Sequence, residues 1–156
     1  MATFEYRQAE EIRDAFARYG VRYLFIGKSG AILLGYPDTT QDADVYVEKS
    51  LQNGRALVIA LRELGFEIDD AQQSDIERGR DFVQMKNGPF DLDLIFAPDG
   101  IETFEDAWRR HINVEGFLVC SLDDIIGSKA AANRKKDRES LERLRAFREY
   151  YKNKNR

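Results

Sequence analysis

The chain has 156 residues, of which 43% are apolar and 33% are charged. This length and composition are typical of one globular domain with a core of its own. No apolar run approaches the roughly 18 residues that a membrane-spanning helix needs. The opening stretch, MATFEYRQAEEIRDAF, lacks the apolar segment of a secretory signal peptide. The single cysteine, Cys120, excludes a framework of internal disulfides, so we expect a cytoplasmic protein in a reducing compartment.

The net charge of −4 is unevenly distributed along the chain. Residues 121–156 contain eleven Lys and Arg against six Asp and Glu, a balance of +5, so residues 1–120 carry −9. An acidic body with a basic end can hold a metal ion in one place and a polyanion in another. The same charges can also form a solvated helix face with ion pairs four residues apart. Both interpretations stay open at this point.

Hydrophobic periodicity and turn residues divide the chain into alternating helices and strands. In chain order we expect a helix at 6–19, a strand at 21–27, a short helix at 29–35, a strand at 42–48, a helix at 51–64, strands at 66–68 and 81–86, an Asn-Gly hairpin turn at 87–88, a strand at 89–96, a short helix at 103–110, a strand at 115–120, and helices at 121–133 and 136–151. This order predicts one domain of the α/β (α+β) class, in which helices pack on a small mixed sheet. Its core spans about 20–120, and a C-terminal helical region spans about 121–152.

The residues Gly27-Lys28-Ser29 coincide with the end of a phosphate-binding P-loop. That motif, G-x-x-x-x-G-K-[ST], needs a glycine at position 22, which is Arg22, and residues 23–26 are bulky and apolar. A P-loop is therefore excluded. A strand that turns at a glycine into a helix still presents free backbone N–H groups to an anion. We therefore expect Gly27, Lys28 and Ser29 to bind phosphate.

Two Asp-x-Asp pairs lie on expected strands. Because residues i and i+2 of a strand point to the same side, Asp42 shares a face with Asp44, and Asp91 shares a face with Asp93. Asp is unfavourable in strands, and two like charges on one face repel, a cost that persists where a divalent cation lies between them. Carboxylates completed by phosphate and water are typical ligands of Mg²⁺. The pairs can also decorate a solvent-exposed face, but two pairs downstream of a phosphate turn favour a metal site.

The order of these features resembles the nucleotidyltransferase fold of the polymerase-beta superfamily. The resemblance is to its minimal form, found in antibiotic nucleotidyltransferases and in MNT-like proteins associated with toxin–antitoxin pairs. Members often read G-G-x-A-x-x-x-x-G-x-x-R-x-T-x-D-x-D, and residues 27–47 here read GKSGAILLGYPDTTQDADVYV. The matching positions are Gly27, Gly35, Thr40, Asp42 and Asp44.

The resemblance extends over about 20–145. FDLDLIFA at 90–97 is similar to the strand that bears the third carboxylate, and SLDDIIGSKAAANRKKDRESLERL at 121–144 resembles the C-terminal helices of these small transferases. The basic and acidic residues that recur in those helices are here Lys129, Arg134, Lys136 and Asp137.

The resemblance implies transfer of a nucleoside monophosphate from an NTP, such as ATP, to a hydroxyl acceptor. It implies that Asp42 and Asp44 bridge two Mg²⁺ ions. Asp93 would complete the site of the ion that lowers the pKa of the acceptor hydroxyl. Asp91 shares the face of Asp93 and is the weaker candidate, because the Leu-Asp-Leu-Ile surroundings of Asp93 match the family strand better. Asp91 would at most contact the metal ligands without binding the ion itself.

The resemblance also implies that Gly27, Lys28 and Ser29 hold the β- and γ-phosphates, with Lys129 as a further phosphate partner. The sequence leaves the acceptor open between an RNA 3′ end, a small molecule such as an antibiotic, and a protein side chain. A partner chain or a second copy in a homodimer could supply a missing wall of the site.

Two departures from the family pattern favour a different function. Lys28 replaces the second glycine of the turn, and Asp38 replaces the usual Arg, which removes a positive charge beside the metal site. A catalytically inactive partner protein on the same fold, such as an antitoxin, is therefore the alternative, although the retained carboxylates disfavour it. A domain that only binds nucleic acid is a third option, and the acidic body argues against it.

Overall fold

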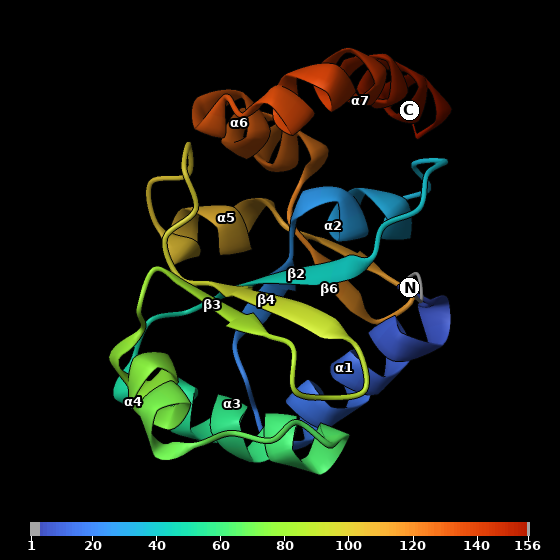
Figure 1. The fold of residues 1–156 in the computed structure, drawn as a ribbon. Coiled ribbons are helices and arrows are strands. Elements are labelled where there is room, and N and C mark those ends of the chain that lie inside the picture. The colour runs from blue at the N-terminus through green and yellow to red at the C-terminus, as the bar shows by residue number, and fades with distance from the viewer. Residues whose placement is uncertain (1–3, 156) are drawn as a thin grey trace.

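The computed structural model describes residues 4–155, which form a mixed six-stranded sheet between two layers of helices (Figure 1). The helices of this part of the chain are α1 (Tyr6–Arg18), α2 (Gly27–Leu33), α3 (Leu51–Leu64), α4 (Asp70–Arg78), α5 (Phe104–Arg110), α6 (Leu122–Ala132) and α7 (Lys135–Lys154). The strands are β1 (Tyr23–Phe25), β2 (Asp42–Val47), β3 (Phe82–Met85), β4 (Asp91–Ile95), β5 (Ile112–Val114) and β6 (Phe117–Val119). The predicted α/β class is confirmed.

The strand order across the sheet is β3-β4-β2-β1-β6-β5. The pairs β2–β4 and β1–β6 are parallel, whereas β1–β2, β3–β4 and β5–β6 are antiparallel. The two Asp-bearing strands β2 and β4 are therefore neighbours near the middle of the sheet, and β3 forms one of its edges. This adjacency could not be read from the sequence, in which the two strands lie more than forty residues apart.

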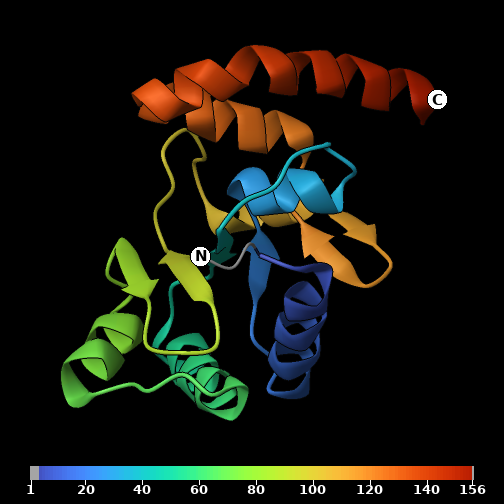
Figure 2. The ribbon, with the colours of Figure 1, turned by 45° about the vertical axis from the view of Figure 1, so that its right-hand side comes forward.

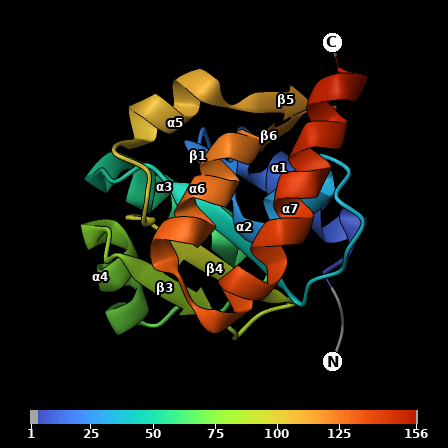
Figure 3. The ribbon, with the colours of Figure 1, turned by 90° about the horizontal axis from the view of Figure 1, so that it is seen from above.

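Helices cover both faces of the sheet. Helices α1, α3 and α4 lie on one face, and α2 lies on the other with α6 and α7 beyond it (Figures 1 and 2). Seen from above, α6 and α7 cross the sheet side by side (Figure 3). No helix within residues 4–155 has both the length and the apolar character needed to cross a membrane.

Alternation along the central strands separates the core from the site. Ala43 and Val45 of β2 and Leu92 and Leu94 of β4 are fully buried toward the α1–α3–α4 layer. A slip of one residue in the pairing would place carboxylates in that core, so the apolar positions fix the register. The intervening Asp residues consequently face the α2–α6–α7 side.

Several helix ends are as the sequence predicts. Ser50 caps α3 by accepting a hydrogen bond from the Asn53 amide, and Gly65 ends the helix in the left-handed conformation at φ 105°. Ser121 caps α6 through the Asp124 amide, and Asn133 ends it at φ 53°. These capping groups satisfy backbone groups that a helix end leaves unpaired.

The strand expected at 66–68 is wrong, and the helix that follows it was not anticipated. Phe66 is buried against Phe90, with ring centroids 5.3 Å apart, and this segment crosses between α3 and α4 without joining the sheet. Helix α4 begins after the cap Asp69 and buries a single residue, Ile76. One buried position leaves too weak a periodicity for a helix to be recognised from the sequence.

Two further boundaries differ from expectation. The strand expected at 115–120 begins at Phe117, because Glu115 and Gly116 adopt positive φ and form the turn after β5, a strand that was not anticipated. The β3–β4 hairpin is antiparallel as expected, but its connection spans 86–90. It is longer than a two-residue turn, since Phe90 is buried in the core.

Candidate active site

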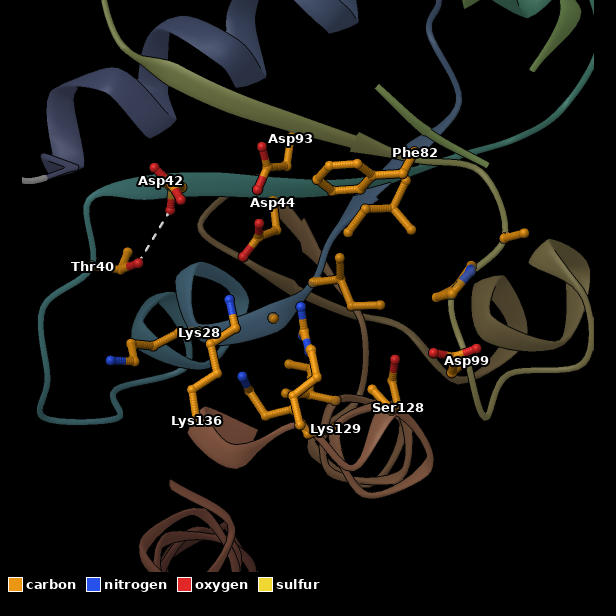
Figure 4. A pocket seen from close by; sticks show the side chains of 18 of the residues that line it. Lys28, Thr40, Asp42, Asp44, Phe82, Asp93, Asp99, Ser128, Lys129 and Lys136 are labelled. Atoms are coloured by element: carbon orange, nitrogen blue, oxygen red, sulfur yellow. Dashed lines mark hydrogen bonds between the residues drawn. The ribbon is translucent and has the colours of Figure 1, made fainter. Parts of the chain in front are cut away.

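The parallel pairing of β2 with β4 brings the two Asp-x-Asp pairs together. Asp44 lies directly opposite Asp93, and Asp42 lies opposite Asp91. Asp42, Asp44 and Asp93 line one pocket, with a volume of about 720 Å³, whereas Asp91 does not line it. The three carboxylates predicted to act together therefore share one cavity (Figure 4).

The glycine turn passes directly against one of these carboxylates. Gly27 has φ 65°, a conformation that strongly favours glycine. A methyl group at this position would lie 2.4 Å from Oδ2 of Asp44. The backbone N–H of Ile26 donates to the Asp44 carbonyl oxygen at 3.0 Å. The residue type at Gly27 is thus required both by its backbone angle and by its closeness to Asp44.

Ser29 has a structural role at the junction of α2 and β2. Its hydroxyl is fully buried and does not line the pocket. The Oγ atom donates to the Ile26 carbonyl at 3.1 Å and accepts from the Asp44 backbone N–H at 2.9 Å. These hydrogen bonds, with a longer one of 3.5 Å from Oγ to the Asp44 carbonyl oxygen, fix the α2–β2 junction, and the phosphate contact expected of Ser29 stays a prediction. Ser29 therefore positions Asp44.

Burial and neighbouring carboxylates raise the pKa of both Asp44 and Asp93 above the ordinary value of an aspartate. Burial, together with the adjacent Asp93, raises the pKa of Asp44 to about 8. Burial also raises the pKa of Asp93, with a further contribution from Asp42. Only 8% of Asp93 is exposed, and its Oδ1 atom has no hydrogen-bond partner. Buried carboxylates that face each other and leave an oxygen unpartnered are costly unless a proton or a cation binds them.

The donor set fits magnesium. All the side-chain donors are carboxylate oxygens, the ligands that Mg²⁺ prefers, and the unpartnered Oδ1 of Asp93 is free to take one. Among residues 4–155, no three His, Cys, Asp or Glu side chains are grouped closely enough to form a ready-made cage. Mg²⁺ commonly binds through one or two carboxylates plus substrate phosphates, so Asp44 and Asp93, with Asp42 nearby, can hold it together with a nucleotide.

A positively charged wall faces the carboxylates. Lys129 of α6 and Arg134 at the start of α7 both contact the fully buried Asp137, with N–O distances of 3.5 and 2.7 Å. Burial lowers the pKa of Lys129, and the charges of Asp137 and Asp44 act against that shift. Lys129, Arg134 and Lys136 all line the pocket, and Lys129 and Lys136 lie opposite the strands that bear the carboxylates (Figure 4).

The two departures from the family pattern are in contact with each other. The Lys28 ammonium lies 3.3 Å from Asp38 Oδ2, and Arg143 of α7 lies 3.6 Å from the same oxygen. The backbone N–H of Thr39 and the two cations hold the pKa of Asp38 below its usual value, although burial acts against them. Arg143 thus restores from another helix a positive charge that position 38 lacks, and Lys28 still lines the pocket.

Several pocket residues were missed by sequence reasoning. Phe82 and Gln84 come from the edge strand β3, Asp99 from the loop after β4, and Ser128 from α6. Phe82 is an apolar side chain that is 50% exposed, and an exposed aromatic on a strand was the only signal available for it. The others are single polar residues in segments whose spatial neighbours depend on the strand order.

No protein-family model matches the sequence, and no curated protein sequence matches it. Solved structures do match the fold. The lincosamide antibiotic adenylyltransferase LnuA, with lincomycin bound, superposes with a TM-score of 0.65 at 14% identity, covering 92% of this chain and 98% of that one. A proposed nucleotidyltransferase from Thermotoga maritima superposes with a TM-score of 0.58 at 14% identity, covering 87% and 89%. The chain therefore has the nucleotidyltransferase fold, as the motif order implied.

Proposed function

We propose that this protein is a Mg²⁺-dependent nucleotidyltransferase that moves a nucleoside monophosphate from an NTP to a hydroxyl acceptor. The observation that carries the proposal is the pair Asp44 and Asp93, adjacent on parallel strands beneath the turn at Gly27, with the buried Oδ1 of Asp93 unpartnered. Such a pair lowers the stability of the fold unless a proton or a cation binds it, and this cost supports a metal site at this position.

Asp42, Asp44 and Asp93 are the residues that would hold magnesium. A magnesium ion held there would supply positive charge to the attacking and the leaving oxygen of an in-line displacement. The acceptor oxygen bonds to the α-phosphorus, the bond to the bridging oxygen breaks, and pyrophosphate leaves with that electron pair. The hydroxyl proton passes to water.

The chain's own cations bind the phosphates. Lys28 at the turn and Lys129 and Lys136 on the opposite wall line the pocket on the side of α2, α6 and α7. Asp137 holds Lys129 and Arg134 in place through its two oxygens. Gly27 lets the backbone approach the triphosphate closely, and Ser29 keeps Asp44 aligned through its backbone N–H.

The direct test is to incubate the protein with each α-labelled NTP, Mg²⁺ and total cellular RNA, protein or small-molecule extract. Transfer of label that requires Mg²⁺ and disappears in Asp93→Asn supports the proposal. The Asp91→Asn variant is the matched control, because Asp91 lies on the same strand face but outside the pocket. Label transfer that persists in Asp93→Asn contradicts the assigned mechanism.

A second candidate is a binding partner without catalytic activity, such as an antitoxin. The ion pair between Lys28 and Asp38 favours it, because this contact engages a charge expected to hold phosphate. Magnesium-dependent NTP binding, measured by calorimetry, separates the two functions. A partner protein of this kind shows none, whereas the transferase binds nucleotide only when Mg²⁺ is present.

The acceptor is not specified by the fold. LnuA is a lincosamide antibiotic adenylyltransferase solved with lincomycin, so this fold accommodates a small-molecule acceptor in at least one protein of similar length. For the present chain a small molecule, an RNA end and a protein side chain are all candidates, and the lining of the pocket provides the means to choose among them.

A further inference from the structure

The loop between α2 and β2, residues 34–41, brings three parts of the structure together at Asp38. Its Oδ2 atom lies 3.3 Å from the Lys28 ammonium of α2 and 3.6 Å from the Arg143 guanidinium of α7. Its Oδ1 atom accepts a hydrogen bond from the backbone N–H of Thr39 at 2.7 Å. The loop passes beside α7 on its way to β2 (Figure 3). One carboxylate therefore links α2, the entry to β2 and α7.

Lys28 is able to bind either of two partners. Its side chain lines the pocket, and the proposed function assigns it to the phosphates. The same ammonium contacts Asp38 in the structure. An ammonium has three donors on a flexible stem of four carbons, so it can turn from one acceptor to another. Because 33% of the Lys28 side chain is exposed, its ion pair is screened by water and is weak enough for a phosphate to displace.

Asp38 keeps partners when Lys28 turns away. The backbone N–H of Thr39, with Lys28 and Arg143, holds the pKa of Asp38 below its usual value although burial acts against them. Two of these three groups remain in contact without the lysine. Arg143 is also held from below, since its guanidinium lies over the buried ring of Tyr36, 5.6 Å from the centroid. The carboxylate therefore stays charged and in place while the lysine moves.

A fixed carboxylate beside the phosphate site opposes phosphate binding in two ways. It attracts Lys28 and so competes with phosphate for the ammonium, and its own negative charge repels phosphates. Arg143 reduces both effects, because it shares the same Oδ2 atom. Under the proposed function, pyrophosphate is the product that the pocket's cations hold after transfer. A carboxylate that takes back one of those cations speeds the release of that product.

We propose that Asp38 is a positioning residue that competes with the phosphates for Lys28 and thereby weakens the hold of the pocket on pyrophosphate. This inference deepens the proposed transferase function and rests on it. The Lys28 ammonium binds phosphate while the nucleotide occupies the pocket, and it returns to Asp38 as pyrophosphate leaves. The contact between Lys28 and Asp38 is thus compatible with catalysis, because it gives the lysine a partner between turnovers.

The test is calorimetric titration of magnesium pyrophosphate and magnesium tripolyphosphate onto the full chain. These probes carry the phosphates of the reaction without a base. Asp38→Asn frees Lys28 and removes the repelling charge, so both probes are expected to bind roughly two- to fivefold more tightly. Arg143→Gln leaves the carboxylate to Lys28 alone, and a weakening of roughly the same factor is expected. Lys28→Gln is expected to weaken binding as well.

A double-mutant cycle separates competition for Lys28 from a general change of charge. In the Lys28→Gln background, Asp38→Asn is expected to change the affinity for pyrophosphate much less than in the wild type, because the residue through which Asp38 acts is gone. Stopped-flow release of pyrophosphate from Asp38→Asn alone is expected to be slower by roughly two- to fivefold.

Asp75→Asn is the matched control. The carboxylate of Asp75 on α4 contacts two cations, Arg78 and Arg80, and its side chain is 22% exposed, as is that of Asp38. Asp75 lies outside the pocket. This variant removes the same kind of charge from the same kind of contact, and it is expected to keep the wild-type affinity for both probes.

The outcomes separate the two proposals. Unchanged or weaker pyrophosphate binding by Asp38→Asn overturns the role of Asp38, as does an equal effect of that substitution in the Lys28→Gln background. Should Asp38→Asn not fold, Arg143→Gln changes a side chain that is 60% exposed, and unchanged affinity in that variant overturns the competition. Failure of the wild type to bind either probe with Mg²⁺ overturns instead the transferase function on which the inference rests.

Discussion

Replacing Asp44 by Asn is expected to stabilise the protein and abolish transfer. Burial and the facing Asp93 raise the pKa of Asp44 from 3.8 to about 8. At pH 7 the Asp44 carboxyl therefore keeps its proton in the folded state, whereas in the unfolded state its pKa lies about three units below that pH and the proton is released. This difference in pKa lowers the free energy of unfolding by roughly 4 kcal/mol at most. Asn has the same shape without the charge but still desolvates an amide, so about 2 kcal/mol of stability is expected to be recovered.

The assay is thermal and urea unfolding of wild type and variant. A gain of about 2 kcal/mol corresponds to a rise in Tm of roughly 4–8 °C for a domain of this size. Because the folded carboxyl has the raised pKa, the unfolded state binds fewer protons between about pH 4 and pH 8, and wild-type stability falls as pH rises through that window. The stability of Asp44→Asn is expected to depend much less on pH in this window.

Magnesium provides the second half of the test. Binding of Mg²⁺ needs deprotonated carboxylates, so the cation is expected to stabilise the wild type most at pH 8 and to leave Asp44→Asn unchanged. Asp91→Asn serves as the control, because it removes a carboxylate from the paired strand outside the pocket, and it keeps the Mg²⁺ response. A destabilised Asp44→Asn that still responds to Mg²⁺ would refute the assignment of Asp44 as a strained metal ligand.

Three further substitutions test the supporting structure. Gly27→Ala places a methyl group 2.4 Å from Asp44 Oδ2 at a positive φ. We expect this variant to lose at least about 1–2 kcal/mol of stability in urea unfolding and to bind nucleotide with Mg²⁺ more weakly in calorimetry. Wild-type values in both measurements would contradict the close approach of Gly27 to Asp44. Ser29→Ala leaves the Asp44 backbone N–H without its partner. We expect it to lower the free energy of unfolding by about 1–3 kcal/mol even without nucleotide. Unchanged unfolding together with weaker phosphate binding would instead support a direct contact between Ser29 and phosphate. Asp137→Asn leaves Lys129 and Arg134 without the carboxylate that both contact. We expect the free energy of unfolding to fall by about 3 kcal/mol and the KM for NTP to rise. An unaltered Tm would exclude the structural role of Asp137.

The sequence predicted the fold where its signals were local. Helix α3, with its serine cap and terminal glycine, and strand β2, with its alternating pattern, were located correctly because capping and periodicity act within a few residues. Helix α4 was missed because one buried residue gives no periodicity. The segment at 66–68 was mistaken for a strand because Phe66 is buried by a distant aromatic partner rather than by a sheet.

The candidate site followed the same division. The pairs Asp42–Asp44 and Asp91–Asp93 were singled out because Asp at alternate strand positions breaks a local preference, and the resemblance to the family strand favoured Asp93 over Asp91. Ser29 was expected to bind phosphate because it follows the glycine turn in the sequence. Its hydrogen bonds to Ile26 and Asp44 could not be foreseen, since they arise only once α2 packs on β2. Phe82 could not be placed at all, since its closeness to Asp93 depends on β3 occupying the edge beside β4.

The departures from ordinary folding preferences converge on one point of the structure. Facing carboxylates in strands and an unpartnered buried oxygen on Asp93 each reduce stability when taken alone, and both lie where Gly27 takes a positive φ beside Asp44. A sequence selected for folding alone would distribute such features or remove them, since most of the chain follows its local preferences. Their meeting in the pocket that Lys129 and Arg134 also line is what the proposed function expects, because its ligand carries both a cation for the carboxylates and phosphates for the basic wall. A magnesium-bound nucleotide has that charge distribution.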